Sequence, residues 1–146
     1  MNPRKGLVLD ANILMRAALG RRIRELLNRY GSAASFYSPD VCFADARYYL
    51  ERELKLEREL KKRGRHTVTG LAAINELSRT IQVVGRDLYG DFEQRARKRV
   101  RMHDPNEWPV VAAALLLDLP IWTEDQDLFG SGVATWTTDR VELFLR

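Results

Sequence analysis

The strongest constraint on the fold comes from a short apolar run near the start of the chain. Residues Gly6 to Leu9 form an uninterrupted run that ends in the carboxylate of Asp10. A run without polar alternation is typical of a strand that is buried on both faces, as in a parallel sheet. Further strands are predicted at residues 35–37, 80–84, 120–123 and 133–136.

Helical patterns separate these strands. The segment 13–30 is predicted as one helix broken at Gly20 or as two short helices. The sequence Ser38-Pro39-Asp40 combines a hydroxyl cap, a proline and an acid in the first turn, so a helix is predicted from there to Arg63, ending at Gly64. Other helices are predicted at residues 68–78, 87–100, 107–117 and 139–144. Because strands and helices alternate at intervals suited to right-handed crossovers, the predicted fold class is α/β with a mainly parallel sheet.

The composition is that of one globular domain. Of the 146 residues, 45% are hydrophobic and 30% are charged, so residues 1–146 are predicted to form a single domain. The lone cysteine, Cys42, excludes an internal disulfide framework and is expected to be a buried, inert thiol. No stretch approaches the run of about 20 apolar residues of a membrane helix, and residues 1–5 lack the apolar region of a signal peptide. A cytoplasmic location without membrane association is therefore expected.

Acidic residues follow two of the predicted strands and begin two of the predicted helices. Asp10 comes directly after the first strand, and Asp125 follows strand 120–123. Asp45 lies near the start of its helix, and Glu107 begins the apolar helix that leads into the Asp125 strand. In open α/β sheets the active crevice lies beyond the carboxyl ends of the strands. Each acid alone could be a helix cap, a turn residue or a solvated side chain, but together they could converge on one rim.

Such a group of carboxylates requires a counter-ion, since like charges in one cleft raise each other's pKa. A hard divalent cation removes the repulsion and prefers oxygen ligands, so the expected cofactor is Mg²⁺ or Mn²⁺. Two histidines, His66 and His103, with one cysteine make a zinc site of the Cys/His kind implausible. A cation that bridges carboxylates and a phosphodiester can lower the pKa of bound water and stabilise charge on the reacting oxygens. The number of ions, one or two, is left open.

The basic residues are compatible with a polyanionic partner. The net charge of +4 becomes +8 when the four acids are left out, and the sequence pI is about 9.5. A basic body around an acidic pocket suits a phosphate backbone. The densest basic segment is expected either to bind backbone phosphates of the substrate beside the site or to be a solvated helix face; it comprises Arg95, Arg97, Lys98, Arg99 and Arg101.

Four segments, in this order, resemble the motifs of PIN domains, including VapC-type toxins. Gly6 to Asn12 resembles the opening strand with its D-x-N motif, and Ser38 to Asp45 the segment with the family's second acid. Glu107 to Leu115 resembles the acid and alanine-rich helix, and Pro120 to Phe129 the strand that ends in T-x-D. The resemblance spans essentially the whole chain. It implies a three-layer α/β/α sandwich and endonucleolytic cleavage of RNA, with a small antitoxin protein and a homodimer as further expectations.

Carried over residue by residue, the resemblance implies four metal ligands, which are Asp10, Asp45, Glu107 and Asp125. It implies that Asn12 and Thr123 orient these ligands, and that Asp104 and Asp127 are supplementary acids. Two residues depart from the family pattern. Asp45 stands where glutamate is common, and Glu107 where aspartate is common. Each exchange changes the reach of the carboxylate by one methylene group, and Asp104 is an alternative to Glu107 as the third acid.

The predicted function is therefore a Mg²⁺- or Mn²⁺-dependent endoribonuclease, the toxin of a toxin–antitoxin pair. Two alternatives remain open at this stage. One is a PIN-like module that binds RNA or protein without cutting it. The exchanged lengths of the two acids and the basic segment are the features that favour this alternative. The other is a metal-dependent hydrolase of small phosphoesters.

Overall fold

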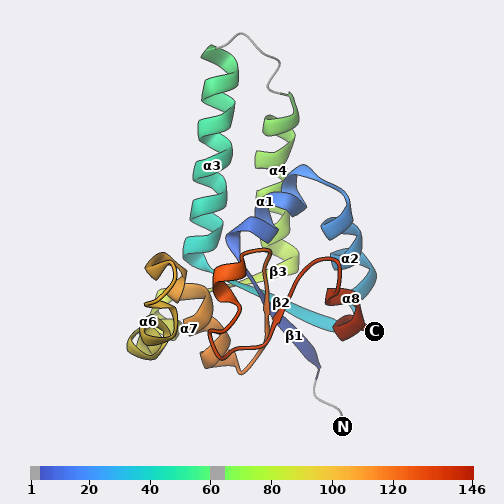
Figure 1. Ribbon diagram of the computed structural model, residues 1–146. Helices are drawn as coiled ribbons and strands as arrows, with labels where there is room; N and C mark the ends of the chain where they lie inside the picture. The colour runs from blue at the N-terminus through green and yellow to red at the C-terminus, as the bar shows by residue number, and fades with distance from the viewer. Residues whose placement is uncertain (1–3, 60–64) are drawn as a thin grey trace.

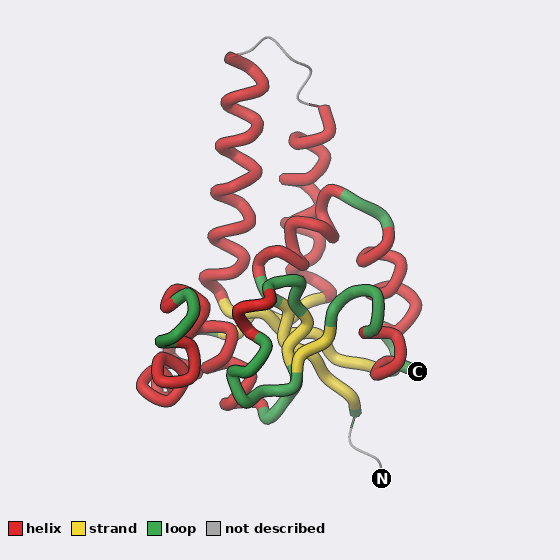
Figure 2. The backbone as a smooth tube through the Cα atoms, in the orientation of Figure 1, coloured by secondary structure: helices red, strands yellow, loops and turns green. Residues whose placement is uncertain are grey.

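A computed structural model describes residues 4–59 and 65–146 and contains a five-stranded, all-parallel sheet with the order β3-β2-β1-β4-β5 (Figures 1 and 2). The prediction of an α/β fold with a mainly parallel sheet is confirmed. The strands are β1 (Lys5–Leu9), β2 (Ala34–Pro39), β3 (Ile81–Val84), β4 (Ile121–Trp122) and β5 (Thr135–Trp136).

Helices cover both faces of the sheet, which gives the three-layer sandwich. Along β1, Leu7 and Leu9 point into one apolar core and Val8 into the other, as the two-residue period of a strand requires. The first core is covered by α1 (Ala11–Leu19), α2 (Arg22–Tyr30), α3 (Asp40–Glu59), α4 (Arg65–Thr80) and α8 (Val141–Leu145). The second is covered by α5 (Arg86–Tyr89), α6 (Glu93–Val100) and α7 (Trp108–Leu117).

Two helices extend beyond the sheet. In Figure 1, α3 and α4 lie side by side and rise above the body of the molecule. Among the residues described, no helix is both long and apolar enough to cross a membrane. The predicted end of the third helix, at Arg63 and Gly64, falls outside the described residues.

The predicted helix start, with Ser38 as the cap and Pro39 as the first helical residue, is wrong by one residue. Both residues belong to β2, where Pro39 pairs with Val84 of β3. The Ser38 hydroxyl donates a hydrogen bond to the Leu9 carbonyl oxygen at 2.7 Å, so it ties β2 to β1 instead of capping a helix. Strand pairing has overridden the local capping signal. Asp40 begins α3, and its carboxylate accepts a hydrogen bond from the Val41 backbone N–H at 2.8 Å.

Other predicted elements are present with shifted or broken boundaries. The segment 13–30 forms two helices separated at Gly20, and the single helix predicted at 87–100 is divided by the short 3-10 helix η1 (Gly90–Phe92). Two further 3-10 helices, η2 (Pro105–Glu107) and η3 (Gln126–Leu128), contain or follow predicted acids. Glu107 therefore ends a 3-10 turn just before α7.

The sheet register brings the ends of β1 and β4 together. Leu9 pairs with Trp122, and the Asp10 backbone N–H donates to the Trp122 carbonyl oxygen at 3.1 Å. Asp10 and Thr123, the next residue on each strand, are therefore neighbours at the carboxyl edge. In α7, seven of ten residues are buried against the sheet, which fixes the helix with its first turn near the same edge.

Candidate metal centre

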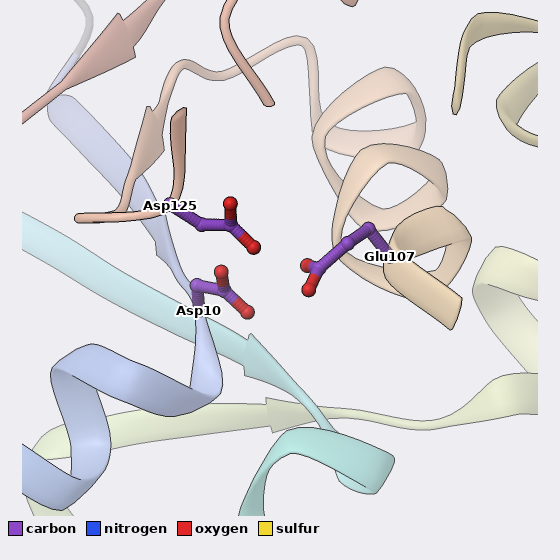
Figure 3. A group of neighbouring side chains, drawn as sticks. All are labelled: Asp10, Glu107 and Asp125. Carbon is purple, nitrogen blue, oxygen red and sulfur yellow. The ribbon is translucent and has the colours of Figure 1, made fainter. Parts of the chain in front are cut away.

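Three of the four predicted acids meet at the carboxyl edge of the sheet. Asp10 follows β1, Asp125 follows β4 and Glu107 precedes α7, and Figure 3 shows their carboxylates pointing toward one another. One carboxylate oxygen from each lies within 4.8 Å of the others. This separation is close enough for a single cation to contact all three, since divalent metals bind carboxylate oxygens at roughly 2.0–2.6 Å.

Asp10 is both a helix cap and the buried member of the group. Only 5% of its surface is exposed. One carboxylate oxygen accepts a hydrogen bond from the Ala11 backbone N–H at 2.8 Å, which caps α1. The other accepts from the Thr123 hydroxyl at 2.8 Å and from the Asn12 side-chain amide at 3.1 Å. Capping and participation in the acidic group are thus not alternatives for this residue.

Asn12 and Thr123 connect the two strand ends. The Asn12 amide also donates to the Thr123 hydroxyl at 3.3 Å, and its oxygen accepts from the Glu124 backbone N–H at 3.2 Å. The Thr123 hydroxyl oxygen accepts from the Asp125 backbone N–H at 2.9 Å. These bonds fix the orientation of Asp10 and the backbone on both sides of Glu124, as the predicted ligand-orienting role would require.

Replacement of Asn12 by alanine is expected to weaken metal binding by roughly 10–100-fold, the usual cost of losing a group that orients a ligand. The alanine variant loses one donor to Asp10 and the tether to Glu124. Isothermal titration with Mn²⁺ would measure the change. Asn28→Ala, at an exposed position on α2, is the matched control and should leave Mn²⁺ affinity unchanged. Equal affinity of Asn12→Ala and the wild type would contradict the orienting role.

Burial and mutual repulsion raise the pKa of two members of the group. Burial is the main cause of the raised pKa of Asp10, opposed by its hydrogen bonds from Thr123 and Ala11 and reinforced by the charge of Asp125. Burial first, and then the charges of Asp10 and Asp125, raise the pKa of Glu107 to about 8. Without a cation the group therefore retains a proton near neutral pH, and a bound cation would replace that proton.

Asp45 lies beside the three-acid group. It is an exposed residue of α3 and lines a small cavity of about 60 Å³ together with Asp10 and Glu107. Partial burial raises the pKa of its carboxyl. Among the residues that the structure describes, however, Asp45 is not one of the acids that come within 4.8 Å of one another.

Asp104 and Asp127 are also outside the three-acid group in the described part of the chain. The Asp104 carboxylate caps η2 by accepting from the Asn106 backbone N–H at 3.0 Å. Asp127 is exposed, and its carboxylate lies 4.0 Å from His103 Nδ1. Between the two alternatives for the third acid, the geometry places Glu107, not Asp104, against Asp10 and Asp125.

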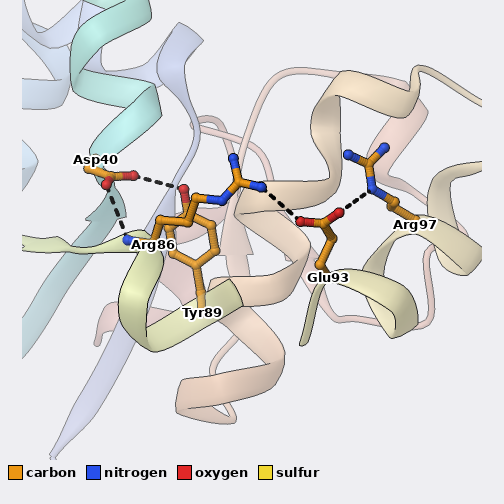
Figure 4. Close-up of polar contacts among 5 residues, drawn as sticks. All are labelled: Asp40, Arg86, Tyr89, Glu93 and Arg97. Carbon is orange, nitrogen blue, oxygen red and sulfur yellow. Dashed lines mark hydrogen bonds and ion pairs between the residues drawn. The ribbon is translucent and has the colours of Figure 1, made fainter. Parts of the chain in front are cut away.

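The basic segment on α6 is partly engaged in internal contacts. Arg97 pairs with Glu93 at 2.9 Å, and Glu93 also pairs with Arg86 at 3.0 Å (Figure 4). Both guanidinium groups lie over the Trp108 ring, at 5.0 and 5.2 Å from its centroid. The other residues predicted to bind RNA are exposed. Arg99 donates to the Ser131 carbonyl oxygen, and Arg95 lies over the Phe92 ring. Lys98 and Arg101 therefore have the fewest internal contacts of the segment in the described residues.

The Arg86–Glu93–Arg97 group is a feature that the sequence did not reveal. Trp108 directly follows Glu107, so the two arginines hold the residue at the start of α7. Figure 4 also shows Asp40 accepting hydrogen bonds from the Arg86 backbone N–H at 3.1 Å and the Tyr89 hydroxyl at 2.7 Å. The start of α3, the helix that contains Asp45, and the start of α7, which directly follows Glu107, are thus connected through α5.

Fold and site together define an α/β protein with an acidic group, suited to a divalent cation, at the carboxyl edge of a parallel sheet. Residues 8–146 match the family model of the PIN domain, and the chain belongs to this family. A search of curated protein sequences finds no significant match.

Solved structures with this fold are distant in sequence. PAE2754 from Pyrobaculum aerophilum has a TM-score of 0.68 at 14% identity, over 97% of this chain and 89% of that chain. VapBC2 from Rickettsia felis, bound to a DNA fragment from its promoter, has a TM-score of 0.63 at 10% identity, over 90% and 98%. A toxin–antitoxin complex from Klebsiella pneumoniae has a TM-score of 0.55 at 14% identity, over 90% and 97%. At these identities the likeness concerns the fold.

Proposed function

We propose that this PIN-domain protein is a Mg²⁺- or Mn²⁺-dependent endoribonuclease. The observation that carries the proposal is the convergence of Asp10, Glu107 and Asp125 from three segments of the chain. All three donors are carboxylates, which suits a hard cation and not a soft one. The raised pKa values of Asp10 and Glu107 fit a site that exchanges protons for a metal.

In this proposal each acid has a position that suits its role. Asp10, fixed by Thr123 and Asn12, is the rigid ligand, and Asp125 and Glu107 complete the set from either side. A bound cation would activate water and stabilise negative charge on the phosphate. Asp45 lines the same cavity from α3, and in this proposal its carboxylate would hold a second ion or a water molecule beside the first. Asp104 contributes indirectly, because it caps the turn that carries Glu107.

The proposal also includes a partner: this protein would be a toxin that a small antitoxin protein neutralises. It is supported by the VapBC2 and Klebsiella toxin–antitoxin structures, which share the fold over 90% of this chain. A toxin that cleaves cellular RNA would act in the cytoplasm, without membrane association. A homodimer belongs to the same proposal, and the oligomeric state can be measured by light scattering.

Purified protein incubated with RNA should cleave internal phosphodiester bonds when Mn²⁺ or Mg²⁺ is added and should stop when excess chelator is added. Parallel reactions contain single-stranded DNA and a small chromogenic phosphodiester. RNA binding without cleavage in either metal would favour the non-catalytic module. Hydrolysis of the small ester alone would favour a phosphoesterase, and cleavage that persists in chelator would exclude the metal mechanism.

A further inference from the structure

A groove of about 660 Å³ lies between α1, α2 and α3. Asn12, Met15, Arg16 and Leu19 line it from α1, and their spacing of three and four residues puts them on one face of the helix. Tyr49 lines it from α3. Its volume lies within the range of small-ligand pockets, roughly 300–1,000 Å³, so it is large enough for part of an oligonucleotide.

Two helices connect the groove to the acids. Asn12 lines the groove and also donates to the Asp10 carboxylate. Four residues further along α1, Arg16 lies on the same helix face. On α3, Asp45 lines the acidic cavity, and Tyr49 follows it at the same four-residue spacing. The acidic cavity and the groove are therefore lined by the same two helices.

The charges and surfaces in the groove suit a nucleic-acid strand. Arg16, Arg21 and Arg22 line it, and no acidic side chain does so in the part of the chain that the structure describes. Arg22 is 3.5 Å from Glu142, whereas Arg16 and Arg21 have no ion pair within residues 4–59 and 65–146. Tyr49 is 46% exposed. Exposed aromatic rings beside arginines are the usual elements that bind single-stranded RNA.

We infer that this groove binds the nucleotides next to the scissile phosphate, with Arg16 and Arg21 contacting backbone phosphates and Tyr49 stacking on a base. The inference rests on the proposed nuclease function and states where the RNA substrate would bind next to the acidic group. It also differs from the path over α6 that the sequence suggested. Two of the α6 arginines are bound to Glu93 and Ser131. In the groove, Arg16 and Arg21 have no ion pair within the described residues, and they share its wall with Asn12, which donates to Asp10.

The test measures binding of a fluorescent single-stranded RNA of about 12 nucleotides by anisotropy. The Asp10→Asn background prevents cleavage during the measurement. Arg16→Glu and Arg21→Glu are each expected to weaken binding about tenfold, and the dependence of log K on log salt should become shallower by about 0.7 for each lost phosphate contact. Tyr49→Ala should weaken binding about tenfold and Tyr49→Phe should restore it, because stacking needs the ring and not the hydroxyl.

Arg79→Glu is the matched control, since it makes the same charge change at an exposed position at the end of α4. Arg101→Glu tests the α6 path. If the groove variants bind RNA as tightly as Arg79→Glu does, the inference is wrong, and the groove is left for a protein partner. If the groove variants lose binding but the wild type cleaves no RNA, the groove inference stands while the nuclease proposal fails.

Discussion

With asparagine in place of Asp10, Mn²⁺-dependent cleavage of RNA is expected to fall by a factor on the order of 10²–10³. Asparagine is as good a helix N-cap as aspartate, so the hydrogen bond that begins α1 can be kept. What is lost is one negative charge at the most buried position of the acidic group. Initial rates at saturating Mn²⁺, with thermal unfolding of the same samples, separate the loss of chemistry from loss of folding.

The control for this variant is Asp91→Asn, the same exchange at an exposed residue of η1. It should cleave at the wild-type rate. Asp125→Asn should resemble Asp10→Asn, whereas Asp45→Asn should have a smaller effect because Asp45 lies outside the three-acid group of the described residues. Wild-type cleavage by Asp10→Asn would remove the reason for assigning these acids to catalysis.

The second large effect is on stability, through the competition between protons and metal. The pKa of Glu107 rises from 4.5 to about 8 on folding. The stability contributed by this protonated carboxyl is fully present below pH 4.5 and is lost as the pH rises through about 8. The metal-free protein should therefore unfold at progressively lower temperature across this range. A cation binds the deprotonated form, so saturating Mg²⁺ should remove most of the decline.

A cation present at 100 times its dissociation constant adds about 2.7 kcal/mol of stability if it binds only the folded chain. For a protein of this size that corresponds to a rise in Tm of roughly 5–10 °C. Differential scanning fluorimetry with and without Mg²⁺, at several pH values, measures both effects. Glu107→Gln is the informative variant: its metal-free Tm should depend less on pH and respond less to Mg²⁺. The same pH dependence in Glu107→Gln and the wild type would assign the effect to another group.

The parts of the site that sequence alone located are those that depend on strand ends. Asp10 and Asp125 follow buried apolar runs, and parallel strands necessarily bring such positions to one edge. Glu107 was located by the apolar helix that follows it. The position of Asp45 was predicted less accurately, because its place on a helix face does not determine its distance from the other acids. A difference of a few ångströms decides whether it joins the group.

Other features depend on contacts between segments that are distant in sequence. Ser38 and Pro39 form a good local cap signal, yet pairing with β3 and the hydrogen bond from Ser38 to Leu9 make them the end of a strand. The contacts of Arg86 and Arg97 with Trp108 depend on how α5 and α6 pack against α7, which no local pattern in the sequence reveals. A cluster of arginines therefore looked like a surface for RNA although part of it has a structural role.

The position of Asn12 has a consequence for regulation. Its side chain is hydrogen-bonded to an acid of the candidate metal centre and also forms part of the groove wall. Any molecule that shifts Asn12 when it occupies the groove will change the affinity for the cation. Reciprocity then requires the cation to change the affinity for that molecule by the same factor. If both proposals hold, the cation and the groove ligand are thermodynamically linked through this single amide, and occupancy of one site would be measured as a change in affinity at the other.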